Sequence, residues 1–190
     1  MGNSKVLIIT FGLTGCGKSF ISKILNKKLK NSILIQSDKI RKQIFGISPY
    51  KKVIVPYGQG IYSEKISEEV YEKMIEIADD FLKNNKNVII DASFLKLKWR
   101  KKAKELAFKN NAKFFIIAPF ALPQKIKERL LKRKRDISDG RWEIYLKQKE
   151  NYERINDNEK KYTIFIDNNK SKKEILKEID CFLSVLKNVI

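Results

Sequence analysis

Eight residues near the start of the chain have the spacing of a phosphate-binding loop. Residues 12–19 read G-L-T-G-C-G-K-S, which fits the pattern G-x-x-x-x-G-K-[S/T]. In such a loop the glycines let backbone N–H groups point inward around a phosphate, at the positive end of the helix that follows. Lys18 is expected to reach the β- and γ-phosphates, and Ser19 to supply an oxygen to Mg²⁺. The sequence therefore predicts that the protein binds ATP or another nucleoside triphosphate.

The residues around this loop have the pattern that it requires. An apolar, β-rich run over residues 6–11 precedes it, and an amphipathic helix pattern follows it directly. A Gly-rich turn that merely joins a strand to a helix is the structural alternative. The predicted nucleotide-binding residues of this segment are Gly12, Thr14, Gly15, Cys16, Gly17, Lys18, Ser19 and Phe20.

Two carboxylates follow predicted strands at the edge of the sheet where the loop should lie. Asp38 comes after the run I-L-I-Q-S and could accept the proton of an attacking hydroxyl, or could cap a helix over residues 39–45. Arg41 would share a helical face with it and could hold the acceptor or its phosphate. Asp91 ends the run V-I-I-D, where it would order Mg²⁺ together with Ser19, or else act as an N-cap or as a partner for Arg41.

Further polar residues follow these strands. Ser93 and the pair Trp99 and Arg100 come just after Asp91 and are placed to face an acceptor. An arginine-rich segment over about residues 129–141 is typical of a lid that closes over phosphates and excludes water. Its candidate catalytic residues are Arg129 and Arg133, with Arg135 behind them on the nucleotide. For each arginine alone, a solvated helix face is the alternative.

The elements that must position these residues alternate along the chain in the manner of a parallel sheet covered by helices. Strands are expected over residues 5–11, 33–37, 87–92, 113–118 and 162–166. Helices are expected over residues 64–83, 95–109 and 140–156, after Pro123, and after a capping box from Ser171 to Glu174. The segment 45–62 reads as a long loop, and loops of that length are usually functional. A single α/β domain over residues 1–190 is predicted.

Composition narrows the chemistry. The chain has no histidine, which excludes Ser-His-Asp triads and histidine-based zinc sites, so that a carboxylate is the favoured general base. A disulfide at Cys16 would disable the loop, so a reduced, cytoplasmic setting is expected. No apolar run is long enough to span a membrane, and no secretion signal is seen at the start.

The net charge of +19 is unevenly distributed. Residues 18–52 and 96–135 are rich in Lys and Arg and nearly free of acids, whereas residues 61–82 are acidic. Basic blocks beside a nucleotide site indicate a polyanionic partner, although lysines that only solvate helix faces give the same pattern.

Several motifs together resemble one family. The loop, D-K-I-R after the second strand, V-I-I-D-A-S-F on the third, R-L-L-K-R and D-I-S-D-G-R-W-E are similar to those of small P-loop kinases with AAA-like ATP-binding domains. That group is close to the 5′-OH kinase domain of polynucleotide kinases, although the D-x-S-D segment is typical of the AAA-like group. The resemblance implies the P-loop NTPase fold, with a five-stranded parallel sheet in the order 2-3-1-4-5 and a mobile Arg-bearing lid. It also implies that Asp38 is the general base, that Arg41 binds a phosphate beside the acceptor and that lid arginines bind the ATP phosphates.

These observations predict an ATP- and Mg²⁺-dependent kinase, monomeric or homodimeric, that phosphorylates an acceptor hydroxyl. The favoured acceptor is the 5′-OH end of RNA or DNA, because basic blocks flank the site. The alternatives are a kinase of a small molecule (a sugar acid, an antibiotic or a nucleoside) and a nucleic-acid-binding NTPase without an acceptor.

Overall fold

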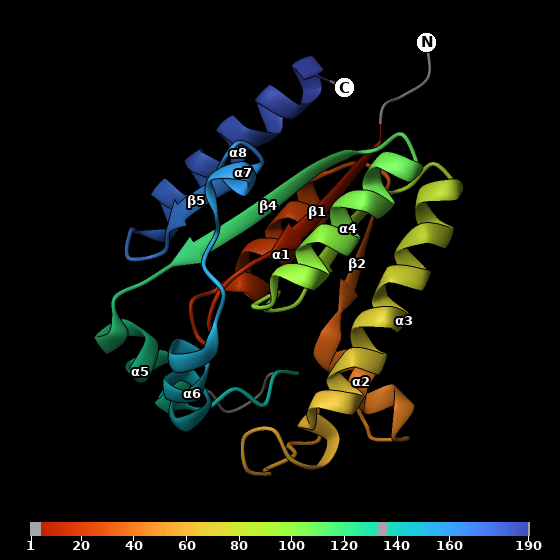
Figure 1. The fold of residues 1–190 in the computed structure, drawn as a ribbon. Coiled ribbons are helices and arrows are strands. Elements are labelled where there is room, and N and C mark those ends of the chain that lie inside the picture. Colours follow the sequence, from red (N-terminus) through yellow and green to blue (C-terminus); the bar gives the residue numbers. More distant parts are fainter. Residues whose placement is uncertain (1–4, 133–136, 190) are drawn as a thin grey trace.

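The strands pair as one parallel sheet in a computed structural model that describes residues 5–132 and 137–189 (Figure 1). Their order is β2-β3-β1-β4-β5, which confirms the predicted fold. The strands are β1 (Val6–Thr10), β2 (Ser32–Gln36), β3 (Asn87–Asp91), β4 (Lys113–Phe120) and β5 (Thr163–Asp167).

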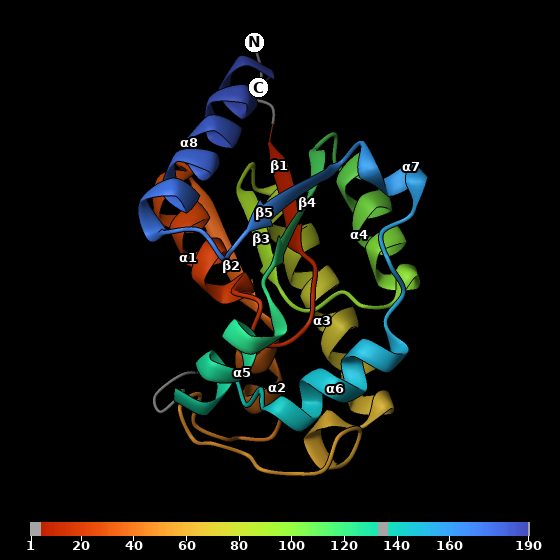
Figure 2. The same cartoon turned by 90° about the vertical axis from the view of Figure 1, so that its left-hand side faces the viewer.

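Helices cover both faces of the sheet and one of its ends. They are α1 (Lys18–Lys28), α2 (Ser37–Ile44), the short 3₁₀ turn η1 (Gly60–Tyr62), α3 (Glu64–Lys83), α4 (Leu97–Lys109), α5 (Pro123–Lys132), α6 (Trp142–Asn151), α7 (Asp157–Lys160) and α8 (Lys172–Val189). Helices α1 and α8 lie on one face, and α3 and α4 lie on the other (Figure 2). Helices α2, α5 and α6 gather at the end of the sheet where the strands finish, whereas β1 begins and α8 ends at the opposite end (Figures 1 and 2). No helix of the described chain is long and apolar enough to cross a membrane.

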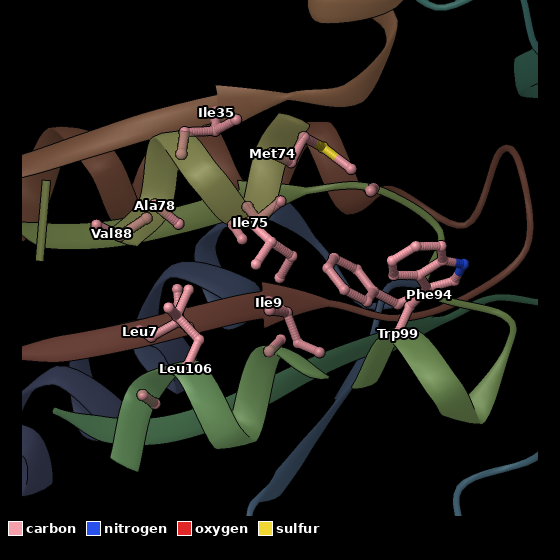
Figure 3. Packing of buried hydrophobic residues seen from close by; sticks show 14 of the residues in the cluster. Leu7, Ile9, Ile35, Met74, Ile75, Ala78, Val88, Phe94, Trp99 and Leu106 are labelled. Carbon is pink, nitrogen blue, oxygen red and sulfur yellow. The ribbon is translucent and has the colours of Figure 1, made fainter. Parts of the chain in front are cut away.

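The central strand carries two cores because successive side chains of a strand point to opposite faces. Leu7 and Ile9 pack in a cluster with residues of α3 and α4, and Figure 3 shows this cluster from close by. Val6 and Ile8 pack in a second cluster with residues of α1 and α8. Strands buried on both faces are apolar throughout, which is why the run before the loop has no polar alternation.

Two expected helices differ from the structure at their ends. The helix expected over residues 140–156 ends at Asn151, and a separate short helix, α7, follows it. This helix begins because the Asn156 side chain accepts a hydrogen bond from the Glu159 N–H in a capping box. The helix expected over residues 95–109 begins at Leu97.

The other expected elements are close to those observed. The capping box before the last helix is confirmed by the hydrogen bonds between Ser171 and Glu174. Apart from the turn η1, residues 45–62 form no regular element, as the sequence predicts.

Truncation of a core residue tests this packing. We expect Ile9→Ala to lower the free energy of unfolding by about 2–5 kcal/mol, because Ile9 is fully buried and a cavity replaces its side chain. Val185 on α8 is 55% exposed, so Val185→Ala should change stability by less than about 0.5 kcal/mol. Urea unfolding followed by circular dichroism measures both, and equal losses would contradict the assigned core.

Candidate active site

The loop between β1 and α1 has the backbone of a phosphate cradle. Gly12, Gly15 and Gly17 have φ angles of 136°, 80° and 104°, a region that side chains disfavour. A Cβ on Gly17 would lie 1.7 Å from Nδ2 of Asn168, so only glycine fits there. The loop runs into α1, whose first N–H groups have no partner inside the helix and can bind an anion.

The Lys18 side chain folds back onto the loop. Its Nζ donates hydrogen bonds to the carbonyl oxygens of Gly12 and Leu13, at 2.8 and 2.9 Å. The Thr14 N–H donates to Oε1 of Gln148 at 2.8 Å, which ties helix α6 to the loop. The sequence analysis did not predict this role of Gln148, because the pattern of a helix does not indicate which polar residue contacts a distant loop.

Asn168 joins the cradle to helix α5. Its side-chain Nδ2 donates a hydrogen bond to the Cys16 carbonyl oxygen at 2.7 Å, and its backbone carbonyl oxygen accepts one from Nη2 of Arg129 at 2.7 Å. Nη1 of Arg129 is buried without a hydrogen-bond partner among the described residues. The sequence analysis also missed Asn168, although it comes directly after β5 at the sheet edge where Asp91 ends β3.

Asp38 lies in the first turn of α2, beside the cavity. The N-cap residue of this helix is Gln36, so the alternative that Asp38 caps a helix is wrong. Burial raises the pKa of the Asp38 carboxyl above its ordinary value, while Arg41 and the Ser138 hydroxyl oppose this rise. A carboxylate with a raised pKa is a stronger base, which suits proton abstraction.

Arg41 is held beside Asp38 by neutral groups. Its Nη1 donates to the carbonyl oxygen of Ile61 at 2.7 Å and to Oγ of Ser67 at 3.3 Å. The guanidinium lies over the ring of Tyr62, 4.6 Å from its centroid, and the buried Nε has no partner within the described chain. The Nε–H group of Arg41 is therefore available to donate a hydrogen bond to a ligand.

Asp91 is 5% exposed and ends β3 next to Gln36, its register partner on β2. It accepts a hydrogen bond from Nε2 of Gln36 at 3.2 Å. The N-cap residue of the next helix is Lys96, so the alternative that Asp91 caps this helix is wrong. Within the described residues, no group of three or more carboxylates or thiols could hold a metal ion by itself. Mg²⁺ needs no such group, since it is usually bound by one or two protein oxygens, water and phosphates, and Ser19 and Asp91 fit that role.

The interpretation of Arg100 as an acceptor-facing residue is wrong. Its side chain is 1% exposed and forms an ion pair with Glu159 of α7 at 2.7 Å. It also donates to the Phe94 carbonyl oxygen at 2.9 Å. Trp99 does line the cavity, where its ring stacks on Tyr71 at a centroid distance of 4.9 Å.

The arginine-rich segment is described only in part. Arg133 and Arg135 lie outside the described residues. Arg141 donates through Nη2 to the Val55 carbonyl oxygen, so it holds the 45–62 loop rather than pointing into the cavity.

One cavity of about 1460 Å³ brings most of the predicted residues together. The predicted site residues that line it are Thr14, Gly15, Gly17, Lys18, Ser19, Phe20, Asp38, Arg41, Asp91 and Arg129. Gly12 and Cys16 belong to the same loop but are buried and do not line the cavity. The cavity therefore joins a phosphate cradle, a carboxylate with a raised pKa and two arginines that each have one buried nitrogen without a partner among the described residues.

Comparison with known proteins agrees with this geometry. A family model described as an AAA domain matches residues 7–174. The chain belongs to this AAA domain family. No curated protein sequence matches this chain.

Solved structures share the fold of this AAA domain over nearly its whole length. A gluconokinase from Sinorhizobium meliloti 1021 has a TM-score of 0.67 at 18% identity and covers 99% of this chain and 97% of its own. Kti12 of Chaetomium thermophilum, in complex with ADP-AlF3, has a TM-score of 0.68 at 17% identity, covering 94% and 97%. The Mycobacterium tuberculosis APS kinase CysC, in complex with AMPPNP and APS, has a TM-score of 0.66 at 15% identity, covering 98% and 99%. The predicted fold of a small P-loop kinase is confirmed, whereas the closeness to polynucleotide kinases stays a prediction.

A substitution at Gly17 tests the cradle. We expect Gly17→Ala to abolish nucleotide binding, because the new Cβ would displace Asn168 and the backbone strain alone costs about 1–2 kcal/mol. Gly46 also has a positive φ, of 61°, but a Cβ there meets no atom within 4 Å. Gly46→Ala should therefore keep nucleotide binding, as measured by calorimetry with a non-hydrolysable ATP analogue. Unchanged affinity in Gly17→Ala would refute the assigned cradle.

Proposed function

We propose that this protein is an ATP-dependent kinase that transfers the γ-phosphoryl group of ATP to a hydroxyl of a small-molecule acceptor. The observation that carries the proposal is that Asp38 and the phosphate cradle line one cavity. A drug-sized ligand occupies a pocket of roughly 300–1000 Å³, so a cavity of about 1460 Å³ has room for two substrates. The whole chain, residues 1–190, would act as one kinase domain with its lid over about residues 129–141.

The cradle side of the cavity suits a triphosphate. The N–H groups at the start of α1 and the Lys18 ammonium would bind phosphate oxygens. The buried, unpartnered Nη1 of Arg129 would donate to the same anion, which would remove an orphan donor. Ser19 and Asp91 would hold Mg²⁺, which would neutralise part of the phosphate charge.

Asp38 supplies the base that transfer to an alcohol requires. Its carboxylate would accept the proton of the acceptor hydroxyl as that oxygen bonds to the γ-phosphorus and the bond to ADP breaks. Arg41 lies next to it with a buried donor to spare, and would orient the acceptor. A nucleotide switch without an acceptor has no need of such a base.

The walls on the acceptor side favour a small molecule. Residues 55–58 of the long loop and residues 137–140 both line the cavity. Lys42 of α2 donates a hydrogen bond to the Ile137 carbonyl oxygen, and Arg141, which follows the second segment, donates one to the Val55 carbonyl oxygen. Walls of this kind suit an acceptor enclosed by the protein, which also excludes water as a competing acceptor. The likeness in fold to a gluconokinase and an APS kinase supports this reading.

The 5′-OH end of RNA or DNA is the second candidate acceptor. It is favoured by the net charge of +19 and by the exposed lysines at the cavity, Lys96, Lys98 and Lys132. A polynucleotide kinase would lose affinity for its acceptor steeply as salt rises, whereas a kinase of a small, weakly charged acceptor would not.

The acceptor is identified by incubating the protein with γ-labelled ATP and a panel of sugars, sugar acids, nucleosides, antibiotics and 5′-OH oligonucleotides. We expect label on a small molecule and none with Lys18→Ala, since the ammonium that holds the phosphates is lost. The exposed Lys173 provides the matched control, because Lys173→Ala should leave transfer unchanged. Label on oligonucleotides alone would favour the second candidate, and slow ATP hydrolysis that no acceptor accelerates would refute both.

Removal of the proposed base tests its role directly. We expect Asp38→Asn to lower the rate of transfer by at least about 100-fold, because the amide cannot accept the proton, while ATP affinity stays nearly unchanged. Asp80→Asn, on the exposed side of α3, is the matched control. Lost ATP binding in Asp38→Asn would assign Asp38 to a metal or structural role instead.

A further inference from the structure

The segment over residues 137–140 touches the proposed base from outside helix α2. The Tyr62 hydroxyl lies between two carboxylates, 2.8 Å from Oδ2 of Asp139 and 3.3 Å from Oδ1 of Asp38. A phenol has one proton to donate, and the shorter contact assigns it to Asp139. Oδ1 of Asp38 therefore keeps a lone pair free for another proton.

A buried ion pair fixes Asp139 in this place. The Lys42 side chain is 0% exposed, and its Nζ lies 3.2 Å from the Asp139 carboxylate. The same ammonium donates to the carbonyl oxygens of Ile137 at 2.7 Å and Pro49 at 3.1 Å. A buried ammonium requires such partners, so Lys42 holds the 137–140 segment and the long loop against α2.

Ser138 also acts on the base. Ser138 and Asp38 line the same cavity, and the Ser138 hydroxyl acts to lower the pKa of the Asp38 carboxyl. Oγ of Ser138 accepts from the Gly140 N–H at 3.3 Å, and Lys52 donates to the Ser138 backbone carbonyl oxygen. Because Oγ accepts from Gly140, the hydroxyl proton of Ser138 remains available for donation to Asp38.

We propose that Ser138 and Asp139 are positioning residues for Asp38. Ser138 orients the carboxylate, and Asp139, neutralised by Lys42, takes the Tyr62 hydrogen bond that would otherwise occupy Asp38. The proposal rests on the proposed function, in which Asp38 is the base. It gives a role to the S-D pair of the D-I-S-D segment, which the function alone leaves without one.

The charges that face Asp38 make the proposal testable by titration. Arg41 on α2 and the Ser138 hydroxyl lower the pKa of Asp38, whereas burial, Asp139 and Asp91 raise it. Tyr62 on η1 also faces Asp38, and its own pKa is raised by burial and by Asp38, so it stays a neutral donor.

Ser138→Ala provides the decisive test. Because a donor to the carboxylate is lost, we expect the pKa of Asp38 to rise by about half a unit to one unit. The acidic limb of the pH profile of kcat/KM should move upward by the same amount, and kcat should fall while the KM for ATP is unchanged. Ser184→Ala, on the exposed side of α8, is the matched control and should change neither quantity.

Asp139→Asn should move the pKa of Asp38 in the opposite direction, downward, because a like charge is removed. If residues 137–140 only shielded Asp38 from water, both substitutions would loosen this segment. Water would then reach Asp38, and its pKa would fall in both variants. A pKa that falls or stays constant in Ser138→Ala therefore overturns the proposal. If Asp139→Asn fails to fold, Ser138→Ala still decides the question.

The titration of Asp38 is followed by carboxyl ¹³C NMR in the full chain, which requires no acceptor. If the wild-type protein phosphorylates nothing in the panel, the proposed function fails. The opposite pKa shifts would then still show that Ser138 and Asp139 position this carboxylate, and their absence would refute the positioning role separately.

Discussion

Parallel pairing of the strands is the constraint on which the site depends. Gln36 is the register partner of Asp91, and Phe120 is that of Asp167, so the residues that follow β2, β3 and β5 arrive at one edge with the loop after β1. A slip of one residue would turn each buried side chain toward the opposite face. The two apolar cores therefore prevent such a slip, and the register that they impose brings the polar residues of the site together.

Two buried cations are neutralised by carboxylates from distant parts of the chain, whereas two arginines at the cavity are held by neutral groups. Lys42 is neutralised by Asp139, and Arg100 by Glu159, in two ion pairs that are almost fully buried. Arg41 instead is held by a carbonyl oxygen and a hydroxyl, and Arg129 by a carbonyl oxygen. The first two cations are structural because their charge is already compensated, whereas the last two retain charge and a donor for a ligand.

The sequence predicts those parts of the site that local pattern determines. The loop follows from its glycine spacing, and Asp38 and Asp91 follow from their positions after apolar strands; the same rule applied to β5 would have found Asn168. The sequence did not predict how Tyr62 and Asp139 contact each other and α2, although Asp139 lies in the D-I-S-D motif, because those contacts depend on how a long loop folds back. Arg100 was wrongly interpreted because its partner, Glu159, lies in the short helix α7, which the sequence analysis did not predict.

The residues that line the cavity gather at one end of the sheet, and the opposite end lies far from them. Strand β1 begins and helix α8 ends at the end far from α2, α5 and α6 (Figures 1 and 2). A surface, a label or a second protein tethered at that end would leave the cavity open to solvent. The protein could thus be immobilised through that end while candidate acceptors are passed over the cavity, so the proposed kinase activity can be screened on a solid support.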